Sequence, residues 1–163
     1  MSKSTSFALP AIILIAIAGV VLWPMLSPTG SSPANRCLSN VKQMGVGMAI
    51  YQSDYDERYP VRDWMTTEHS YVKNWDMFRC SEVDSKLDQF GFGMNLALFG
   101  VDARTLADPA KVPLIFEVDA LGKDVAVNLA AATSGRHETR KGLAYYAVYA
   151  DTHATWKPKG TPP

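Results

Sequence analysis

The longest uninterrupted apolar stretch of the chain covers residues 7–26, FALPAIILIAIAGVVLWPML, and contains no charged residue. Its only hydrogen-bonding side chain is the Trp23 indole. A helix of about 20 residues spans roughly 30 Å, which is the thickness of the hydrocarbon core of a bilayer. The pattern therefore predicts a transmembrane helix over residues 7–26, with Trp23 at the membrane interface.

Two other interpretations of this stretch stay open. A cleaved secretory signal has a shorter apolar region and a small-x-small cleavage site, and residues 27–30 offer no such site. A helix buried in a soluble core needs a larger domain around it than this chain provides. As a membrane helix, the stretch presents small residues against which a second helix can pack: Ala11, Ala16, Ala18 and Gly19.

An amphipathic pattern follows a short linker over residues 27–33. Ser32 suits the N-cap of a helix, and Pro33 suits its first turn. Beyond them, apolar residues recur at spacings of three and four, which predicts a helix with one buried face: Cys37, Val41, Met44, Met48, Tyr51 and Tyr55. Gly45 and Gly47 inside this helix indicate that another element approaches its backbone closely.

The second half of the chain carries strand patterns. Residues 61–110 look like loop with short elements, whereas 112–118, 125–129 and 143–149 are rich in β-branched or aromatic residues. One helix followed by antiparallel strands predicts an α+β domain over residues 34–157, with the helix packed on a small sheet. Residues 158–163 are expected to form a C-terminal tail.

The charge balance and the short N-terminal tail limit the classes of partner and the location that the sequence predicts. Lys+Arg and Asp+Glu number 16 each, which argues against a nucleic-acid-binding protein and against a polybasic lipid-binding surface. Residues 1–6 form a short cytoplasmic tail, and such a tail usually leaves the bulk of the chain outside. We therefore expect a single-pass protein of the bacterial inner membrane that contacts membrane lipid, with its main domain in the periplasm.

The chain has two cysteines, Cys37 and Cys80. In an oxidising compartment an even number of cysteines favours a disulfide between them, and the alternative is two small buried apolar residues. Because they form no CxxC motif, they make a poor metal or haem signature. The sequence predicts no metal site and no cofactor.

Catalytic chemistry has little support in the sequence. His137, Asp151 and His153 could gather at one end of a hairpin as a metal or acid–base site, but hydrogen bonding at turns explains them more simply. Neither the Asp54–Asp56 region nor the acidic residues Glu117, Asp119 and Asp124 have a spacing diagnostic of calcium. The chain contains no nucleophile elbow, phosphate loop or dinucleotide fingerprint, so we predict a non-enzymatic protein.

Several blocks of sequence resemble bacterial prepilin-type, pseudopilin-like proteins, in the same order along nearly the whole chain. The blocks are CLSNVKQMG at 37–45, YVKN at 71–74, FRCS at 78–81, FGFGMN at 90–95, PLIF at 113–116, and the closing Arg136-His137 with Asp151-Thr152-His153. The resemblance implies a pilin-like fold, in which a membrane helix precedes a helix packed on an antiparallel sheet.

The N-terminus departs from that family. Its members usually carry a Gly-Phe-Thr-Leu-Ile-Glu junction, which is cleaved after the Gly. With Phe7 as the first mature residue, Ser6 replaces the Gly and Ala11 replaces the Glu that guides filament assembly. In the closing block, thirteen residues separate His137 from Asp151, where the family has nine.

These departures favour a chain that no longer polymerises. The sequence thus predicts a membrane-anchored structural or accessory subunit of a larger inner-membrane complex, whose partners are other integral membrane subunits. The alternative is a filament subunit of a type IV pilus or a type II secretion pseudopilus. A third class, a periplasmic module that binds a saccharide or a metal, would need an open aromatic or carboxylate site.

Overall fold

The computed structural model of the chain describes residues 11–13, 16–17, 32–83, 89–129 and 135–163. The chain divides into two units, residues 1–31 and residues 32–163. The second unit contains two α-helices, α2 (Pro33–Asp54) and α3 (Trp64–Val72), in its described part. Its strands are β1 (Phe92–Asn95), β2 (Pro113–Glu117), β3 (Ala126–Val127), β4 (His137–Thr139), β5 (Gly142–Tyr149) and β6 (Ala154–Pro158).

The first unit corrects one part of the predicted fold. No helix in the part of the chain that the structure describes is long and apolar enough to cross a membrane. The transmembrane helix predicted over residues 7–26 is therefore not supported. Within this stretch the structure describes residues 11–13 and 16–17, which are helical. Ala11 and Ala16 lie in these pieces, and Ala18, Gly19 and Trp23 lie outside the described residues.

Helix α2 forms where the spacing of apolar residues predicts a helix. The Ser32 hydroxyl accepts a hydrogen bond from the Asn35 amide at 3.2 Å, which caps the first turn, and Pro33 occupies that turn. The predicted stripe is buried from Cys37 to Tyr51. Tyr55, the last predicted member, lies beyond the helix end and is about half exposed, at 54%. The prediction of one buried helix face is thus confirmed up to that point.

The strands form one sheet in which the pairing runs β3-β1-β2-β5-β4, and β6 pairs with β5 along residues 144–148. The pairs β1–β2, β2–β5, β4–β5 and β5–β6 are antiparallel, and only β1–β3 is parallel among the described pairs. The predicted α+β class is confirmed. Strand β1 and helix α3 lie in the stretch 61–110, which was predicted as loop with short elements whose type and bounds were not specified.

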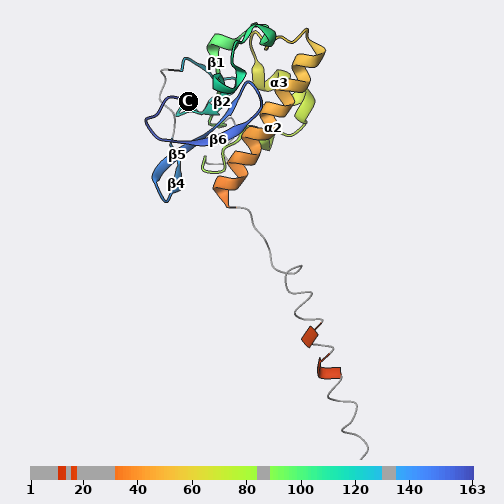
Figure 1. The fold of residues 1–163 in the computed structure, drawn as a ribbon, viewed down its shortest axis with the longest axis vertical. Helices are drawn as coiled ribbons and strands as arrows, with labels where there is room; N and C mark the ends of the chain where they lie inside the picture. Colours follow the sequence, from red (N-terminus) through yellow and green to blue (C-terminus); the bar gives the residue numbers. More distant parts are fainter. Residues whose placement is uncertain (1–10, 14–15, 18–31, 84–88, 130–134) are drawn as a thin grey trace, which may run out of the picture. The chain divides into compact units, whose positions relative to one another are not determined.

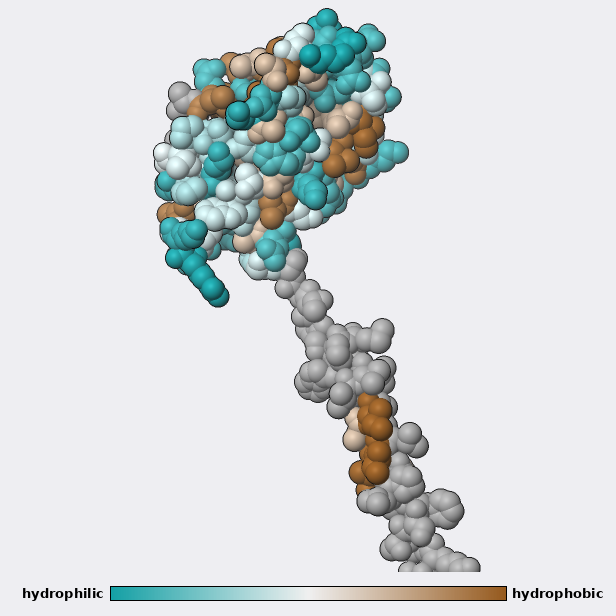
Figure 2. Space-filling view, in the orientation of Figure 1, coloured by the Kyte–Doolittle hydropathy of each residue, from teal (hydrophilic) through white to brown (hydrophobic). Residues whose placement is uncertain are grey.

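Helix α2 packs across the sheet, and α3 lies beside it (Figure 1). A Cβ built on Gly45 would lie 2.5 Å from Val148 Cγ2 of β5, so only glycine allows this approach. One apolar cluster fills the space between α2 and the sheet; Met44, Phe78 and Ile115 belong to it. A smaller one contains Phe116 and Tyr145. The outer surface of this unit is mostly hydrophilic on the face shown in Figure 2.

Candidate metal centre

Four metal-ligating side chains meet inside the second unit. Cys37 lies in the second turn of α2, Cys80 follows the 3₁₀ helix Trp75–Phe78, Glu117 ends β2, and His137 begins β4. Their relative exposures are 0%, 1%, 0% and 2%. Each residue offers one ligand atom, and these atoms are two sulfurs, one imidazole nitrogen and one carboxylate oxygen. All four atoms lie within 4.8 Å of one another. No other group of this kind occurs among the described residues.

The distances within this cluster suit a small ion. The two sulfurs lie 3.1 Å apart, Cys80 Sγ lies 3.4 Å from His137 Nε2, and that nitrogen lies 2.7 Å from Glu117 Oε1. Zinc bonds of about 2.0–2.3 Å in a tetrahedron place neighbouring ligand atoms roughly 3.3–3.8 Å apart. An ion therefore fits once the closest pairs of atoms separate by about 0.6 Å.

The sheet brings the carboxylate and the imidazole together. Strands β2 and β4 both pair with β5, β2 at residues 147–149 and β4 at residues 142–144, and the side chains of Glu117 and His137 meet beside it. The small Ala144 of β5 faces His137 in the register. The second carboxylate oxygen of Glu117 accepts the Tyr146 amide at 3.2 Å, and the Tyr146 ring contacts the imidazole at 4.8 Å. These contacts orient both ligands, as second-shell groups do at metal sites.

Hydrogen bonds also fix the two cysteine segments to each other. The Ser81 amide donates to Cys37 Sγ at 3.0 Å, and the Ser81 hydroxyl donates to the Pro33 carbonyl at 2.9 Å. The Asn40 side chain of α2 donates to the Arg79 carbonyl at 3.2 Å. The sulfur of Cys80 therefore stays next to that of Cys37.

The pKa values of the four side chains are shifted by burial and by their contacts with one another. Hydrogen bonds with Cys80, and to a smaller extent with His137 and Ser81, outweigh the opposing effect of burial and lower the pKa of Cys37 to about 4. The same sulfur–sulfur bond and burial raise the pKa of Cys80. Burial disfavours the imidazolium of His137, but contacts with Cys37 and Glu117 outweigh it and raise the pKa to about 9. Burial raises the pKa of Glu117. The cluster thus pairs a thiolate with an imidazolium.

This geometry suits metal binding better than nucleophilic catalysis. A cysteine–histidine–acid triad uses one imidazole nitrogen for the nucleophile and the other for the acid. Here the same atom, His137 Nε2, faces both Cys80 and Glu117. The burial of all four side chains also leaves no open surface at the sulfurs on which a bulky substrate could bind.

The other residues that the sequence singled out lie elsewhere. His153 pairs with Asp151 at the β5–β6 turn, where both are exposed and His153 stacks on Tyr149 at 4.4 Å. Among the described residues they form no ligand group with His137. Asp124 accepts the Met65 amide at 2.7 Å and so caps α3.

The two cysteines are neighbours, as the predicted disulfide requires, and both are free thiols in the structure. Sequence reasoning missed that Glu117 and His137 join them. A signal was present: Glu117 ends the otherwise apolar strand run PLIFE, and a charge at the end of a buried strand needs a partner.

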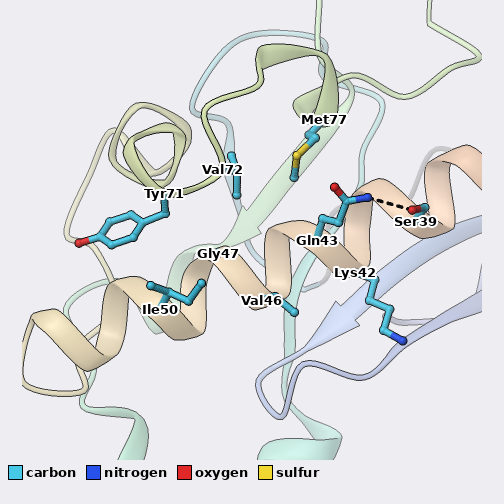
Figure 3. Close-up of a pocket in the computed structure, with 9 residues that line it drawn as sticks. All are labelled: Ser39, Lys42, Gln43, Val46, Gly47, Ile50, Tyr71, Val72 and Met77. Atoms are coloured by element: carbon cyan, nitrogen blue, oxygen red, sulfur yellow. Dashed lines mark hydrogen bonds between the residues drawn. The ribbon is translucent and has the colours of Figure 1, made fainter.

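A separate cavity of about 340 Å³ lies along α2 (Figure 3). Val46 and Ile50 of α2 face Tyr71 and Val72 of α3 across it, and Gln43 donates to Ser39 at 3.0 Å at one end. The described lining contains no cysteine, histidine or carboxylate. This cavity therefore offers an apolar surface without catalytic or metal-binding groups.

Comparisons of the chain with protein-family models, with curated proteins and with solved structures found no match. The resemblance to prepilin-type proteins stays a prediction. The residues of the buried cluster are the basis for a functional assignment.

Proposed function

We propose that residues 32–163 form a non-enzymatic metal-binding domain in which Cys37, Cys80, Glu117 and His137 bind one zinc ion. The observation that carries this proposal is the convergence of four buried ligand atoms, from four separate segments, within 4.8 Å. Buried polar groups of this kind are costly unless they are paired or bind a metal.

The ligand set favours zinc. Zn²⁺ is borderline-soft and binds thiolate, imidazole and carboxylate in tetrahedral sites. Calcium and magnesium prefer sites built from oxygen alone. Two sulfurs, one nitrogen and one oxygen match the zinc preference, and a 2+ ion would offset the negative charge of two thiolates and a carboxylate.

The proposed role of the ion is structural. Four protein ligands complete a tetrahedron and leave no position for the water that a catalytic zinc activates. The ion would join α2, the segment after the 3₁₀ helix, β2 and β4, which are far apart in the sequence. The predicted role as a structural or accessory subunit, and its filament alternative, stay predictions and are compatible with this role.

Metal titration of the purified, reduced, full-length chain tests the proposal. We expect one Zn²⁺ per chain by elemental analysis, and we expect Co²⁺ to give the intense visible bands of a tetrahedral site with thiolate charge-transfer bands. The Cys37→Ser, Cys80→Ser double variant should lose both signals. His153→Gln is the matched control, because His153 lies outside the cluster and should retain them. Equal metal binding by the double variant and the wild type would disprove the assignment.

A further inference from the structure

The two sulfurs of the buried cluster have only each other as disulfide partners. The chain has two cysteines, and their sulfur atoms lie 3.1 Å apart with relative exposures of 0% and 1%. A disulfide bond has a length of about 2.05 Å. The sulfurs therefore need to approach by only about 1 Å to form a covalent bond.

We propose that metal binding at this centre is controlled by oxidation: a peroxide converts the Cys37–Cys80 dithiolate into a disulfide, and the ion is released. This inference rests on the proposed metal-binding function and names its regulation. Oxidation removes two of the four ligands, so Glu117 and His137 alone remain for the ion.

The reaction balances with hydrogen peroxide as the oxidant. One thiolate attacks a peroxide oxygen, the O–O bond breaks, and a sulfenic acid and a hydroxide form. The second sulfur then attacks the sulfenic sulfur, so that the S–S bond forms and a second hydroxide leaves. Two protons from solvent convert the hydroxides into water. The sulfurs lose two electrons, the peroxide gains them, and the ion leaves with its 2+ charge unchanged.

The surroundings of the sulfurs keep the two backbone segments together in both states. The Ser81 amide donates to Cys37 Sγ, and the Asn40 side chain donates to the Asp76 and Arg79 carbonyls, at 3.4 and 3.2 Å. The two Asn40 bonds involve no ligand of the ion and do not depend on it. Closing the disulfide therefore needs side-chain rotation without separation of α2 from the segment that carries Cys80.

The remaining two ligands have partners after the ion leaves. His137 Nε2 lies 2.7 Å from Glu117 Oε1, and the other Glu117 oxygen accepts the Tyr146 amide. Oxidation consumes both thiols, so the oxidised state holds no unpaired thiol. Each state thus satisfies the buried polar groups of the centre, which allows the domain to stay folded in both.

Stepwise oxidation of the zinc-loaded full-length chain tests this inference. Aliquots receive increasing hydrogen peroxide, catalase stops the reaction, and three quantities are measured: zinc captured by a chromogenic chelator, free thiols, and intact mass. We expect zinc release in proportion to thiol loss, one ion for two thiols, with a mass lower by two hydrogens than that of the reduced apoprotein. Dithiothreitol should restore zinc binding.

Two controls separate the outcomes. Cys80→Ser has no second thiol and should never lose two hydrogens, whereas His153→Gln should behave as the wild type does. Zinc retained after disulfide formation, or thiol loss with added oxygen in place of a disulfide, would overturn the inference and leave the metal-binding function standing. Failure of the reduced chain to bind zinc at all would overturn the proposed function itself.

Discussion

Glu68 is the most unusual single residue outside the metal centre. It lies in α3 with no exposed surface, and neither carboxylate oxygen has a hydrogen-bond partner among the described residues. Gly47 of α2 provides the space for it, since a Cβ there would lie 2.9 Å from Glu68 Oε1. Burial raises the pKa of Glu68 well above its usual range, because an apolar environment disfavours the charged form of the carboxyl group.

This residue predicts a pH dependence of stability. Because the pKa is raised on folding, the unfolded chain loses the Glu68 proton first as the pH rises. The contribution of Glu68 to stability is therefore most favourable below the usual carboxyl pKa of about 4.3 and falls as the pH rises toward the folded-state pKa. We expect Glu68→Gln to reduce this fall, measured as urea midpoints at several pH values from acid to neutral. The exposed Glu82→Gln is the control, and an equal fall in all three proteins would contradict the prediction.

At the scale of elements, the contact between α2 and β5 positions the metal centre. Gly45 allows α2 to lie directly against Val148, and Cys37 two turns earlier then reaches the sheet. Asp124, from the loop after β2, caps α3 through the Met65 amide. The Asp63 N-cap of α3 makes no side-chain capping bond of its own. Each helix is thus fixed by a residue that lies far from it in the sequence.

The close approach of α2 to β5 predicts that adding one methyl group at position 45 lowers the stability of the fold. Gly45→Ala would place a Cβ 2.5 Å from Val148 Cγ2, so the helix or the strand must move. We expect a loss of about 1–3 kcal/mol in the free energy of unfolding, which denaturant titration measures. Gly122→Ala is the matched control, because its new Cβ would meet Val125 Cγ2 at an ordinary 3.5 Å. Equal stabilities of the two variants would show that this contact is not tight.

At the scale of the whole molecule, the metal centre connects segments from residue 37 to residue 137. An ion that binds the folded chain alone stabilises it by mass action, by about 2.7 kcal/mol at 100 times the dissociation constant. We expect zinc to raise the melting temperature of the reduced full-length chain. The Cys37→Ser, Cys80→Ser variant should show no such increase, and a similar increase in that variant would place the ion elsewhere.

Local patterns were enough to predict part of this architecture. The apolar period from Cys37 to Tyr51, the cap at Ser32 and the glycine at position 45 foretold α2 and its close packing. The run at 143–149 foretold β5. The stretch 61–110 was predicted as loop with short elements, but α3 was not placed within it, because α3 is short and depends on Asp124 from another segment for its cap. The apolar run at 7–26 predicted a transmembrane helix that the structure does not support.

The sequence by itself determined α2 and β5 of the second unit, because side-chain periodicity and caps act within a few residues. It also supplied the two cysteines that were expected to pair. Only the tertiary structure decided that Glu117 and His137 join them, because β2 and β4 both pair with β5, which brings the two side chains to the sulfurs. The spacing of the four ligand residues along the chain does not predict their contact, since strand order is set by packing over the whole domain.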